Sequence, residues 1–371
     1  MNIPFLDRRV ASHFDFLLIL LVLPIVGISY SLVHEVSESL ANKQLVYTTI
    51  GLLIFLVVFF FPLRKLTWLI PFFYWFNILL LIAVHFVGVT KLGAQRWLEI
   101  PLIDITIQPS EIMKPAFILM MGYLIQHNPP PPEGYDWRAF FKLASYIVLP
   151  FFLIASEPDL GTATILLLLG GMILLVVGLR RKIWVFLIIL GLLSSTLVYE
   201  GLRDYQKKRI HDFLGQKPSY HVQQSIIAIG SGGLKGKAKE DATQTQLRFL
   251  PIATSDFIFA YYVERYGFLG AFMLIFLYAL LILHLLSLTL KVKGDYLAGV
   301  TIVSVAGLFF LYMSVNIAMT VGLAPVTGVP LPMFSHGGSS FINFMILLAI
   351  IQNLLAFRFN YLYHDTGFSI K

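Results

Sequence analysis

The sequence predicts an all-α, polytopic integral membrane protein. Of its 371 residues, 58% are hydrophobic and only 13% are charged, and the mean hydropathy is +0.81. Apolar runs of about 18 residues recur along the whole chain, which is close to the length a helix needs to cross a bilayer. A soluble globular domain does not have this composition. We therefore expect one transmembrane domain over residues 1–371, with no separate soluble domain.

Ten transmembrane helices are predicted from these runs. Arg8 and Arg9 precede the first run and no small-residue cleavage site follows it, so we expect that helix to be retained rather than cleaved as a signal. The eighth run is the longest and should tilt or project beyond the bilayer. The expected spans lie near residues 15–33, 44–61, 68–88, 108–126, 142–156, 159–178, 182–200, 257–288, 297–322 and 333–357.

The distribution of Lys and Arg predicts how the chain is oriented. If the N-terminus is cytoplasmic, the cytoplasmic segments hold most of these residues, and the short outer loops hold only Lys43, Lys91 and Arg96. The large extracytoplasmic loop at about 201–255, between spans seven and eight, is too long to obey this rule strictly. With ten spans, both termini are expected in the cytoplasm. The net charge of +7 is scattered, so nucleic acid is not an expected partner.

Glu111 and Lys114 are three residues apart at the start of the fourth span, after Pro109 and Ser110. This spacing places them on one helix face, where they can form an ion pair. The pair is either a structural link at the mouth of the helix or part of a polar cavity inside the bundle.

Glu157 and Asp159 flank Pro158 in the turn between the fifth and sixth spans. Asp159 is suited to cap the following helix, because a carboxylate there accepts bonds from free amides and complements the helix dipole. The functional alternative is a carboxylate that lines an outward-facing cavity. A pair of acids also raises glycoside hydrolysis, but catalytic pairs of that kind usually come from separate elements.

The run from Gly230 to Lys237 is rich in glycine and resembles a phosphate cradle, but it lacks the spacing of a P-loop. It is either a flexible loop or a set of amides that, with Lys235 and Lys237, holds a diphosphate. The nine His residues show no metal-ligand spacing, and the absence of Cys removes thiolate chemistry. The sequence therefore predicts no metal ligands.

Asp256 follows Thr254 and Ser255 and stands directly before the eighth span, at a membrane boundary. It is either a helix N-cap or a working carboxylate, since ionisable groups at membrane depth are costly. Glu264 lies eight residues further, about 80° around a helix, so the two acids share a face only loosely.

In this order, these segments resemble the SEDS family (shape, elongation, division and sporulation), and its elongation branch in particular. The resemblance covers the whole chain, including the spans and the large loop. The matching motifs are residues 93–98 (GAQRWL), 108–111 (QPSE) with Lys114, 158–162 (PDLGT), 224–225 (QS), 228–234 (AIGSGGL), 249–251 (FLP), 256–260 (DFIFA) and 328–332 (GVPLP), followed by Ser335 and residues 337–339 (GGS).

The resemblance implies a peptidoglycan glycosyltransferase of the bacterial cytoplasmic membrane. This family polymerises lipid II into glycan strands on the outer face, and its essential aspartate falls on Asp256. Its cavity ion pair falls on Glu111 and Lys114. Further candidates for binding substrate are Arg96, Asp159, Lys235, Lys237, Gln244 and Ser335.

The chain departs from the family pattern just before Asp256. Ile252 and Thr254 stand where the family usually has Glu and His, and His336 replaces a tyrosine. Ala238 and Ala242 stand where glycines are usual. Asp256 itself is retained, which implies that the missing acid and imidazole serve to position rather than to react.

Glycosyl transfer needs a base for the acceptor hydroxyl and stabilisation of the leaving diphosphate. We expect Asp256 to take the proton of the lipid II N-acetylglucosamine 4-hydroxyl as it attacks the muramic-acid C1 of an undecaprenyl-diphosphate-linked strand. Arg96, Lys114 and the loop lysines are candidates for the diphosphate.

The resemblance also bears on cofactors, partners and alternatives. It implies no certain cofactor and leaves a divalent cation open. The expected partners are a class B penicillin-binding protein with transpeptidase activity, the elongation machinery and membrane lipids. Two alternatives remain: a lipid II flippase, or a scaffold for a cell-wall transpeptidase. A flippase needs polar groups at midplane or on both sides, whereas this sequence is expected to concentrate them on one side.

Overall fold

The computed structural model describes residues 13–358 except 92–93, 101–104, 158, 202–203, 216–218, 248 and 251–252. The two chain ends that we expect in the cytoplasm lie outside the described residues. So do Pro158, in the turn before Asp159, and Pro251 and Ile252, which precede Asp256.

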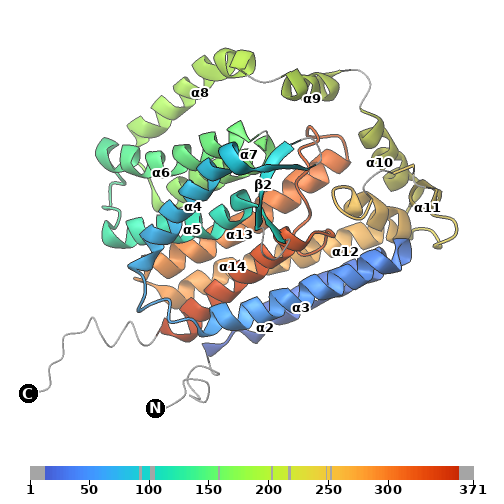
Figure 1. Ribbon diagram of the computed structural model, residues 1–371, viewed down its shortest axis with the longest axis horizontal. Coiled ribbons are helices and arrows are strands. Elements are labelled where there is room, and N and C mark those ends of the chain that lie inside the picture. Colours follow the sequence, from blue (N-terminus) through green and yellow to red (C-terminus); the bar gives the residue numbers. More distant parts are fainter. Residues whose placement is uncertain are drawn as a thin grey trace, which may run out of the picture.

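The described residues form ten long helices, nine of which pack side by side in a bundle, while α8 diverges from it (Figure 1). The N-terminal end of α2 and the C-terminal end of α14 lie at one end of this bundle, which we call the terminal end. The opposite end holds the start of α12 and is called the loop end. The helices are α2 Phe16–Val36, α3 Glu38–Phe60, α4 Leu69–Val87, α5 Pro109–His127, α6 Trp137–Ser156, α7 Leu160–Val177, α8 Arg181–Gly201, α12 Ile258–Leu288, α13 Tyr296–Thr320 and α14 Gly338–Ala356.

Each of the ten predicted spans coincides with one of these helices. Eight of them are long and apolar enough to cross a membrane, and α5 and α8 are not among the eight. The chain is therefore a polytopic helical membrane protein. Helix α5 is less apolar because Glu111 and Lys114 lie in its first two turns.

The centre of the bundle is formed by α5, α13 and α14. Helix α13 packs on α5, α7 and α12, and α14 packs on α3 and α5. Of the apolar windows of α13 and α14, 61% and 72% are buried, against 22–44% for the other six spans. These central helices can hold polar groups away from lipid, whereas α8 diverges from the bundle in Figure 1.

Several helices begin at an acid or hydroxyl, and α3 and α6 begin five or six residues before the spans predicted for them. The side chains of Asp15, Ser37, Asp136 and Asp295 each accept a hydrogen bond from an amide of the first turn of α2, α3, α6 and α13. Such caps satisfy amides that have no partner within the helix. They fix where the spans begin more sharply than hydropathy does.

The segment around Arg96, at the loop end of the bundle, differs from an all-α fold. It forms a small antiparallel sheet in the order β1-β2-β3, in which β2 pairs with both neighbours. The alternation of apolar and polar residues that indicates a strand is short in residues 94–100. A hydropathy average over the length of a transmembrane helix does not detect it. The strands are β1 Val89–Lys91, β2 Ala94–Ile100 and β3 Ile105–Ile107.

The predicted loop at 201–255 contains three short helices. Figure 1 shows α10 and α11 at the loop end beside the start of α12, with α9 above them. Helix α10 packs on α12 and α13, so this part of the loop is an element of the bundle end. The helices are α9 Asp204–Leu214, α10 Tyr220–Ser231 and α11 Thr243–Gln246.

The expectation that buried polar groups gather on one side is only half right. At the terminal end, Arg64 binds Asp295 at 2.7 Å, and Asp15 contacts His284 at 2.8 Å and Lys291 at 3.2 Å. The first pair joins the turn between α3 and α4 to the start of α13, and the Asp15 contacts join the start of α2 to α12 and the short helix that follows it. The other described ion pairs among buried groups lie at the loop end, where the candidate site is found.

Candidate functional site

The turn that carries Asp256 is fixed through its backbone. The carbonyl of Thr254 accepts a bond from the His336 amide at 2.8 Å, and the carbonyl of Ser255 accepts one from the Ser335 hydroxyl at 2.6 Å. The carbonyl of Asp256 accepts one from the Asn316 side-chain amide at 2.9 Å. Three consecutive carbonyls are thus held by α13 and by the segment before α14, which leaves the carboxylate in a defined place.

Asp256 does not cap its helix. Helix α12 begins at Ile258, its N-cap position is Phe257, and no side chain makes a capping bond there. The expectation of a cap is therefore wrong, because the helix starts one residue too late for Asp256 to occupy the cap position. The carboxylate is left available for another role.

The carboxylate of Asp256 is half-buried beside a glycine. A Cβ atom added to Gly328, which has φ +73°, would lie 3.5 Å from Oδ2 of Asp256. Burial raises the pKa of Asp256, while a hydrogen bond from Ser255 and the charge of Arg209 act in the opposite direction. A raised pKa makes a carboxylate a better proton acceptor near neutral pH.

Residues 327–329 connect the Asp256 turn to the start of α7. A Cβ atom added to Gly161 would lie 2.8 Å from the Thr327 carbonyl and 3.5 Å from the Val329 side chain. The Val329 carbonyl accepts the second hydrogen bond of Asn316, at 2.8 Å. The tertiary structure therefore brings the PDLGT and DFIFA motifs to opposite sides of one short segment.

Asp159 is both a cap and an electrostatic partner. Its Oδ1 accepts from the Thr162 amide at 3.3 Å, which confirms the predicted cap of α7. The same oxygen lies 3.7 Å from the Arg96 guanidinium, and its Oδ2 accepts from Gln108 at 3.3 Å. Arg96 also donates to the carbonyl of Glu157 at 3.3 Å. The small sheet thus places Arg96 above the turn between α6 and α7, with 29% of its side chain exposed.

Glu157 is the most unusual acid of this group. Only 2% of it is exposed, and neither carboxyl oxygen has a hydrogen-bond partner within the described residues. Burial and the neighbouring charge of Asp159 raise the pKa of Glu157 to about 8, against the opposing charge of Arg96. Glu157 is therefore mainly protonated at neutral pH, while Asp159 carries the contact with Arg96.

The predicted ion pair of Glu111 and Lys114 is present. Lys114 Nζ lies 2.5 Å from Glu111 Oε1 and 4.9 Å from the ring centre of Tyr312. Lys114 is 1% exposed, so it cannot also bind a diphosphate, and that candidate role is withdrawn. The second oxygen of Glu111 is buried and has no hydrogen-bond partner in the part of the chain that the structure describes. The pair links α5 to α13 inside the bundle.

The glycine-rich segment packs tightly against a kink in α12. Added Cβ atoms at Gly232 and Gly236 would lie 2.1 Å from the carbonyls of Val263 and Arg265, respectively. At the kink, Gly267 has φ +65° and ψ −164°. These glycines are required by the close approach of two backbones, so the alternative of a loose flexible loop is wrong.

The loop candidates Lys235, Lys237 and Gln244 lie along α12 rather than at Asp256. The Lys237 amide donates to the Glu264 carbonyl at 3.0 Å, and the Gln244 amide donates to Glu264 Oε1 at 3.0 Å. Lys235 is exposed. Glu264 is fully buried and accepts these loop bonds, roughly two helical turns from Asp256, so the structure does not bring it to that carboxylate.

Two polar residues at the site were not singled out from the sequence. Asn316 is a single amide side chain within the apolar sequence of α13. A polar side chain inside a membrane span usually makes a hydrogen bond to a neighbouring segment, so its position could have identified it. Arg209 belongs to a basic stretch of the loop, and nothing in its neighbours indicates that its charge reaches Asp256.

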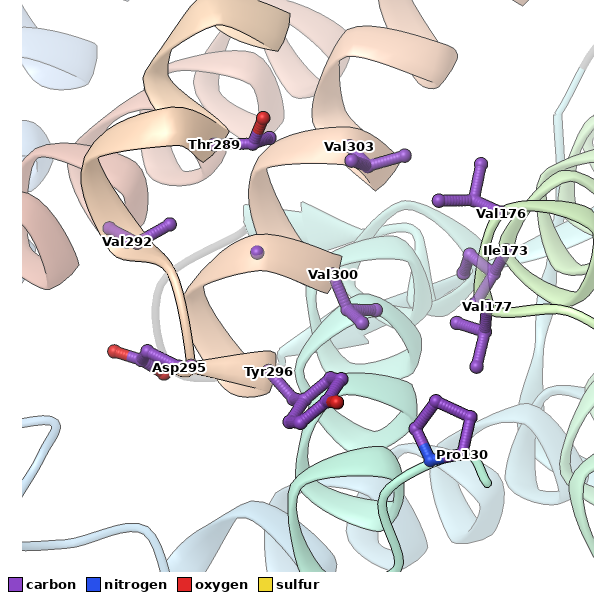
Figure 2. Close-up of a pocket in the computed structure, with 12 residues that line it drawn as sticks. Pro130, Ile173, Val176, Val177, Thr289, Val292, Asp295, Tyr296, Val300 and Val303 are labelled. Atoms are coloured by element: carbon purple, nitrogen blue, oxygen red, sulfur yellow. The ribbon is translucent and has the colours of Figure 1, made fainter. Parts of the chain in front are cut away.

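One apolar pocket lies away from this site. Figure 2 shows it between α7, the short helix η2 (Thr289–Val292) and the start of α13, with a volume of about 340 Å³. Pro130, Asp295 and Tyr296 place it at the terminal end, opposite Asp256. Among the described residues, no group of three or more His, Asp or Glu side chains is arranged to hold a metal ion.

Known proteins resemble this chain over nearly its whole length. The peptidoglycan glycosyltransferase MrdB of Helicobacter pylori (strain ATCC 700392 / 26695) is 55% identical over 361 residues, covering 97% of this chain and 94% of that protein. The MrdB protein of Escherichia coli (strain K12) is 34% identical, covering 93% and 94%. These values are high enough to establish a common family.

Solved structures agree with this relationship. One chain, from work on the structural coordination of polymerization and crosslinking by a peptidoglycan synthase complex, superposes with a TM-score of 0.81 at 27% identity, covering 93% of this chain and 98% of that one. The rod shape determining protein RodA of Thermus thermophilus gives a TM-score of 0.70 at 26% identity, with the same coverage. Residues 5–360 match the family of FtsW, RodA and SpoVE, described as cell cycle proteins, and the chain therefore belongs to this family, as its SEDS motifs indicated.

Proposed function

We propose that this protein is a peptidoglycan glycosyltransferase that polymerises lipid II on the outer face of the bacterial cytoplasmic membrane during cell elongation. The names of the MrdB relatives support this activity. Because the alignments cover more than 90% of both chains, they support assigning the whole activity to this protein. The observation that carries the proposal is the Asp256 turn, whose three carbonyls are held by Asn316, Ser335 and His336.

Asp256 acts as the general base in this proposal. Its carboxylate takes the proton of the N-acetylglucosamine 4-hydroxyl of lipid II, and that oxygen forms a bond to C1 of the strand's muramic acid. The bond between C1 and the diphosphate oxygen breaks, and undecaprenyl diphosphate leaves with the electron pair. Gly328 leaves space beside Oδ2 for the acceptor, and the fixed turn supplies orientation.

Arg96 is the cation that we assign to the leaving diphosphate. It is partly exposed, it is oriented by Asp159 and the Glu157 carbonyl, and it comes from a rigid strand rather than a loose loop. A guanidinium matches phosphate oxygens with several donors at once. The backbone amides of Lys237 and Gln244 attach the loop to Glu264, and Ser335 holds the Asp256 turn. Lys235 is exposed and stays a candidate for contacting the substrate.

The proposed setting in the membrane follows the predicted orientation. We place the loop end outside and both termini in the cytoplasm. We also place α5 and α8 across the bilayer as the fourth and seventh spans, which together with the other eight helices make ten spans in a single transmembrane domain. A class B penicillin-binding protein is the proposed partner, which agrees with the synthase complex that contains a similar chain. The elongation machinery is a further proposed partner.

The test is polymerisation of lipid II by purified protein, with the product separated on gels. Asp256→Asn should lower the rate at least about 10²-fold, because an amide cannot accept the proton. Asp241→Asn, an exposed acid elsewhere in the loop, is the matched control and should keep the wild-type rate. Size-exclusion profiles and thermal unfolding check that both variants are folded.

The same preparation separates the alternatives. A flippase would move fluorescent lipid II from one leaflet of a proteoliposome membrane to the other and would form no glycan. Asp256→Asn would then slow this movement. A scaffold would give no glycan without an active partner and would be insensitive to Asp256→Asn. A near wild-type polymerisation rate for Asp256→Asn would refute the assignment of the base.

A further inference from the structure

A second polar pocket lies at the loop end beside the Asp256 turn. It has a volume of about 220 Å³ and is formed by α9, the start of α10 and the turn that follows α13. Its polar lining consists of Arg209, Asp212, Ser219 and His221, and Phe213 adds an aromatic ring. None of these residues belongs to the motifs that indicated the family or to the candidates identified from the sequence.

The wall of this pocket is firmly attached to the bundle. The Ser225 hydroxyl of α10 donates to the Thr320 carbonyl at the end of α13, at 2.7 Å. Gly322 packs so closely on α10 that an added Cβ atom would lie 3.3 Å from Ile226 and 3.4 Å from Val222. The wall formed by α10 and the turn after α13 is therefore fixed to the bundle, and α9 closes the other side of the pocket.

Two contacts connect the pocket to the Asp256 turn. The His221 ring stacks on the ring of Phe257, the residue after Asp256, with 6.3 Å between ring centres and 29° between planes. The turn after α13 lines the pocket as far as Val326 and reaches Gly328, beside the Asp256 carboxylate, two residues later. A ligand in this pocket would lie next to the reacting groups.

The chemistry of the lining favours a polyhydroxylated, uncharged ligand. Asp212 accepts hydrogen bonds, Arg209 donates them, and Ser219 and His221 can do either. Sugar hydroxyl and acetamido groups offer both donors and acceptors, and the flat apolar face of a sugar ring can pack on Phe213, which is 40% exposed. A diphosphate is a poorer match, because the carboxylate of Asp212 would repel it.

The volume limits the size of the ligand. Pockets for drug-sized molecules measure roughly 300–1,000 Å³, so a pocket of about 220 Å³ is suited to a single sugar ring. We infer that this pocket is a subsite for one sugar of the glycan strand, beyond the two sugars that react at Asp256. This inference rests on the proposed glycosyltransferase function. The subsite would retain the strand between additions and thereby set the length of the glycan product.

The first test measures the length of the glycan at matched consumption of lipid II. Asp212→Ala removes the acceptor and should shorten the products several-fold compared with wild type, because strands are released earlier. His211→Ala is the matched control: His211 is exposed on the same helix and does not line the pocket, so its products should keep the wild-type length. Equal length distributions for Asp212→Ala and wild type would overturn the inference.

The second test measures binding directly and does not depend on activity. A soluble tetrasaccharide of N-acetylglucosamine, which is uncharged and carries no lipid or peptide, is titrated into the full-length protein with NMR saturation transfer as the readout. Wild type and Asp256→Asn should both bind it, and Asp212→Ala should bind about tenfold more weakly, as expected for lost hydrogen bonds to a charged group.

The two tests distinguish failure of the subsite from failure of the proposed function. Polymerisation without tetrasaccharide binding would remove the subsite and leave the glycosyltransferase assignment intact. Tetrasaccharide binding that depends on Asp212 without any polymerisation would keep the sugar site and reject the activity. If inorganic pyrophosphate displaces the tetrasaccharide, the pocket is an anion site and the inference is wrong.

Discussion

The side-chain amide of Asn316 donates a hydrogen bond to the backbone carbonyl of Asp256 at 2.9 Å and a second one to the carbonyl of Val329 at 2.8 Å. One buried side chain of α13 therefore fixes both the carbonyl of the proposed base and the segment that separates this base from the start of α7. Asn316 is fully buried, so bulk solvent does not reach these bonds.

Asn316→Asp should reduce the rate of polymerisation, although the two side chains are nearly the same size. The carboxylate cannot donate, so both carbonyls lose their donor, at a cost of about 1–3 kcal/mol of unfolding free energy each. A displacement of the Asp256 turn by about 1 Å should lower the turnover number by up to about 10²-fold. Lipid II polymerisation under saturating substrate and thermal unfolding measure the two effects.

The control for this prediction lies in the same helix. Ser304→Ala removes a hydroxyl that bonds only to the Val300 carbonyl within α13, so it should leave the turnover number unchanged. If Asn316→Asp also keeps the wild-type turnover number, the Asn316 bonds do not position the base.

Glu157 should make the stability of the protein dependent on pH. The pKa of this acid is raised in the folded state to about 8, so the folded protein holds a proton that the unfolded chain releases above its ordinary value near 4.5. This contribution to stability is fully present below pH 4.5 and is lost as the pH rises to about 8, at up to about 1.4 kcal/mol per pH unit.

Glu157→Gln should remove most of this dependence, because the amide stays neutral at every pH. Thermal unfolding in detergent between pH 5 and pH 9 measures the difference between the variant and wild type. Glu240→Gln changes an exposed loop acid and should follow the wild-type curve. Parallel curves for wild type and Glu157→Gln would contradict the burial of a neutral acid at this turn.

Breaking the ion pair of Glu111 and Lys114 on one side should be more harmful than removing both charges. Lys114→Met leaves a buried carboxylate unpaired and should cost roughly 3–5 kcal/mol of unfolding free energy. The double variant Lys114→Met with Glu111→Leu should recover much of that loss. A double-mutant cycle by thermal or denaturant unfolding tests this, and additive effects would mean that the pair contributes no coupling.

Gly267→Ala should strongly destabilise the junction between α12 and the glycine-rich segment. The residue has φ +65°, and an added Cβ atom would lie 2.4 Å from the Gly236 amide and 2.6 Å from the Leu234 carbonyl carbon. Backbone atoms cannot yield as a side chain can, so we expect a marked fall in thermal stability.

Gly299→Ala is the matched control for this prediction. Gly299 lies in α13 with nothing within 4 Å of an added Cβ atom, so alanine should be neutral or stabilising by up to about 1 kcal/mol. If Gly267→Ala is as stable as Gly299→Ala, the close packing of the kink is not what maintains the loop.

Local sequence signals were sufficient for the positions of the helices and for some of the contacts at the site. Hydropathy located all ten long helices, and the spacing of Glu111 and Lys114 predicted their ion pair. Local rules also predicted the cap at Asp159, and they offered a cap as one of two roles for Asp256, which the structure does not show. The start of a helix can shift by one residue at little cost, and neighbouring segments decide where it falls.

Composition, apolar periodicity and motif order thus determined by themselves that the chain is a polytopic helical membrane protein of the SEDS family. This follows because the bilayer imposes length and apolarity on each span separately. Only the tertiary structure decided that Asn316, Ser335 and His336 hold the carbonyls of the Asp256 turn, that Lys114 is buried, and that a polar pocket adjoins the site. These relationships join residues that are far apart in sequence, and they depend on how the spans pack, which hydropathy alone does not specify.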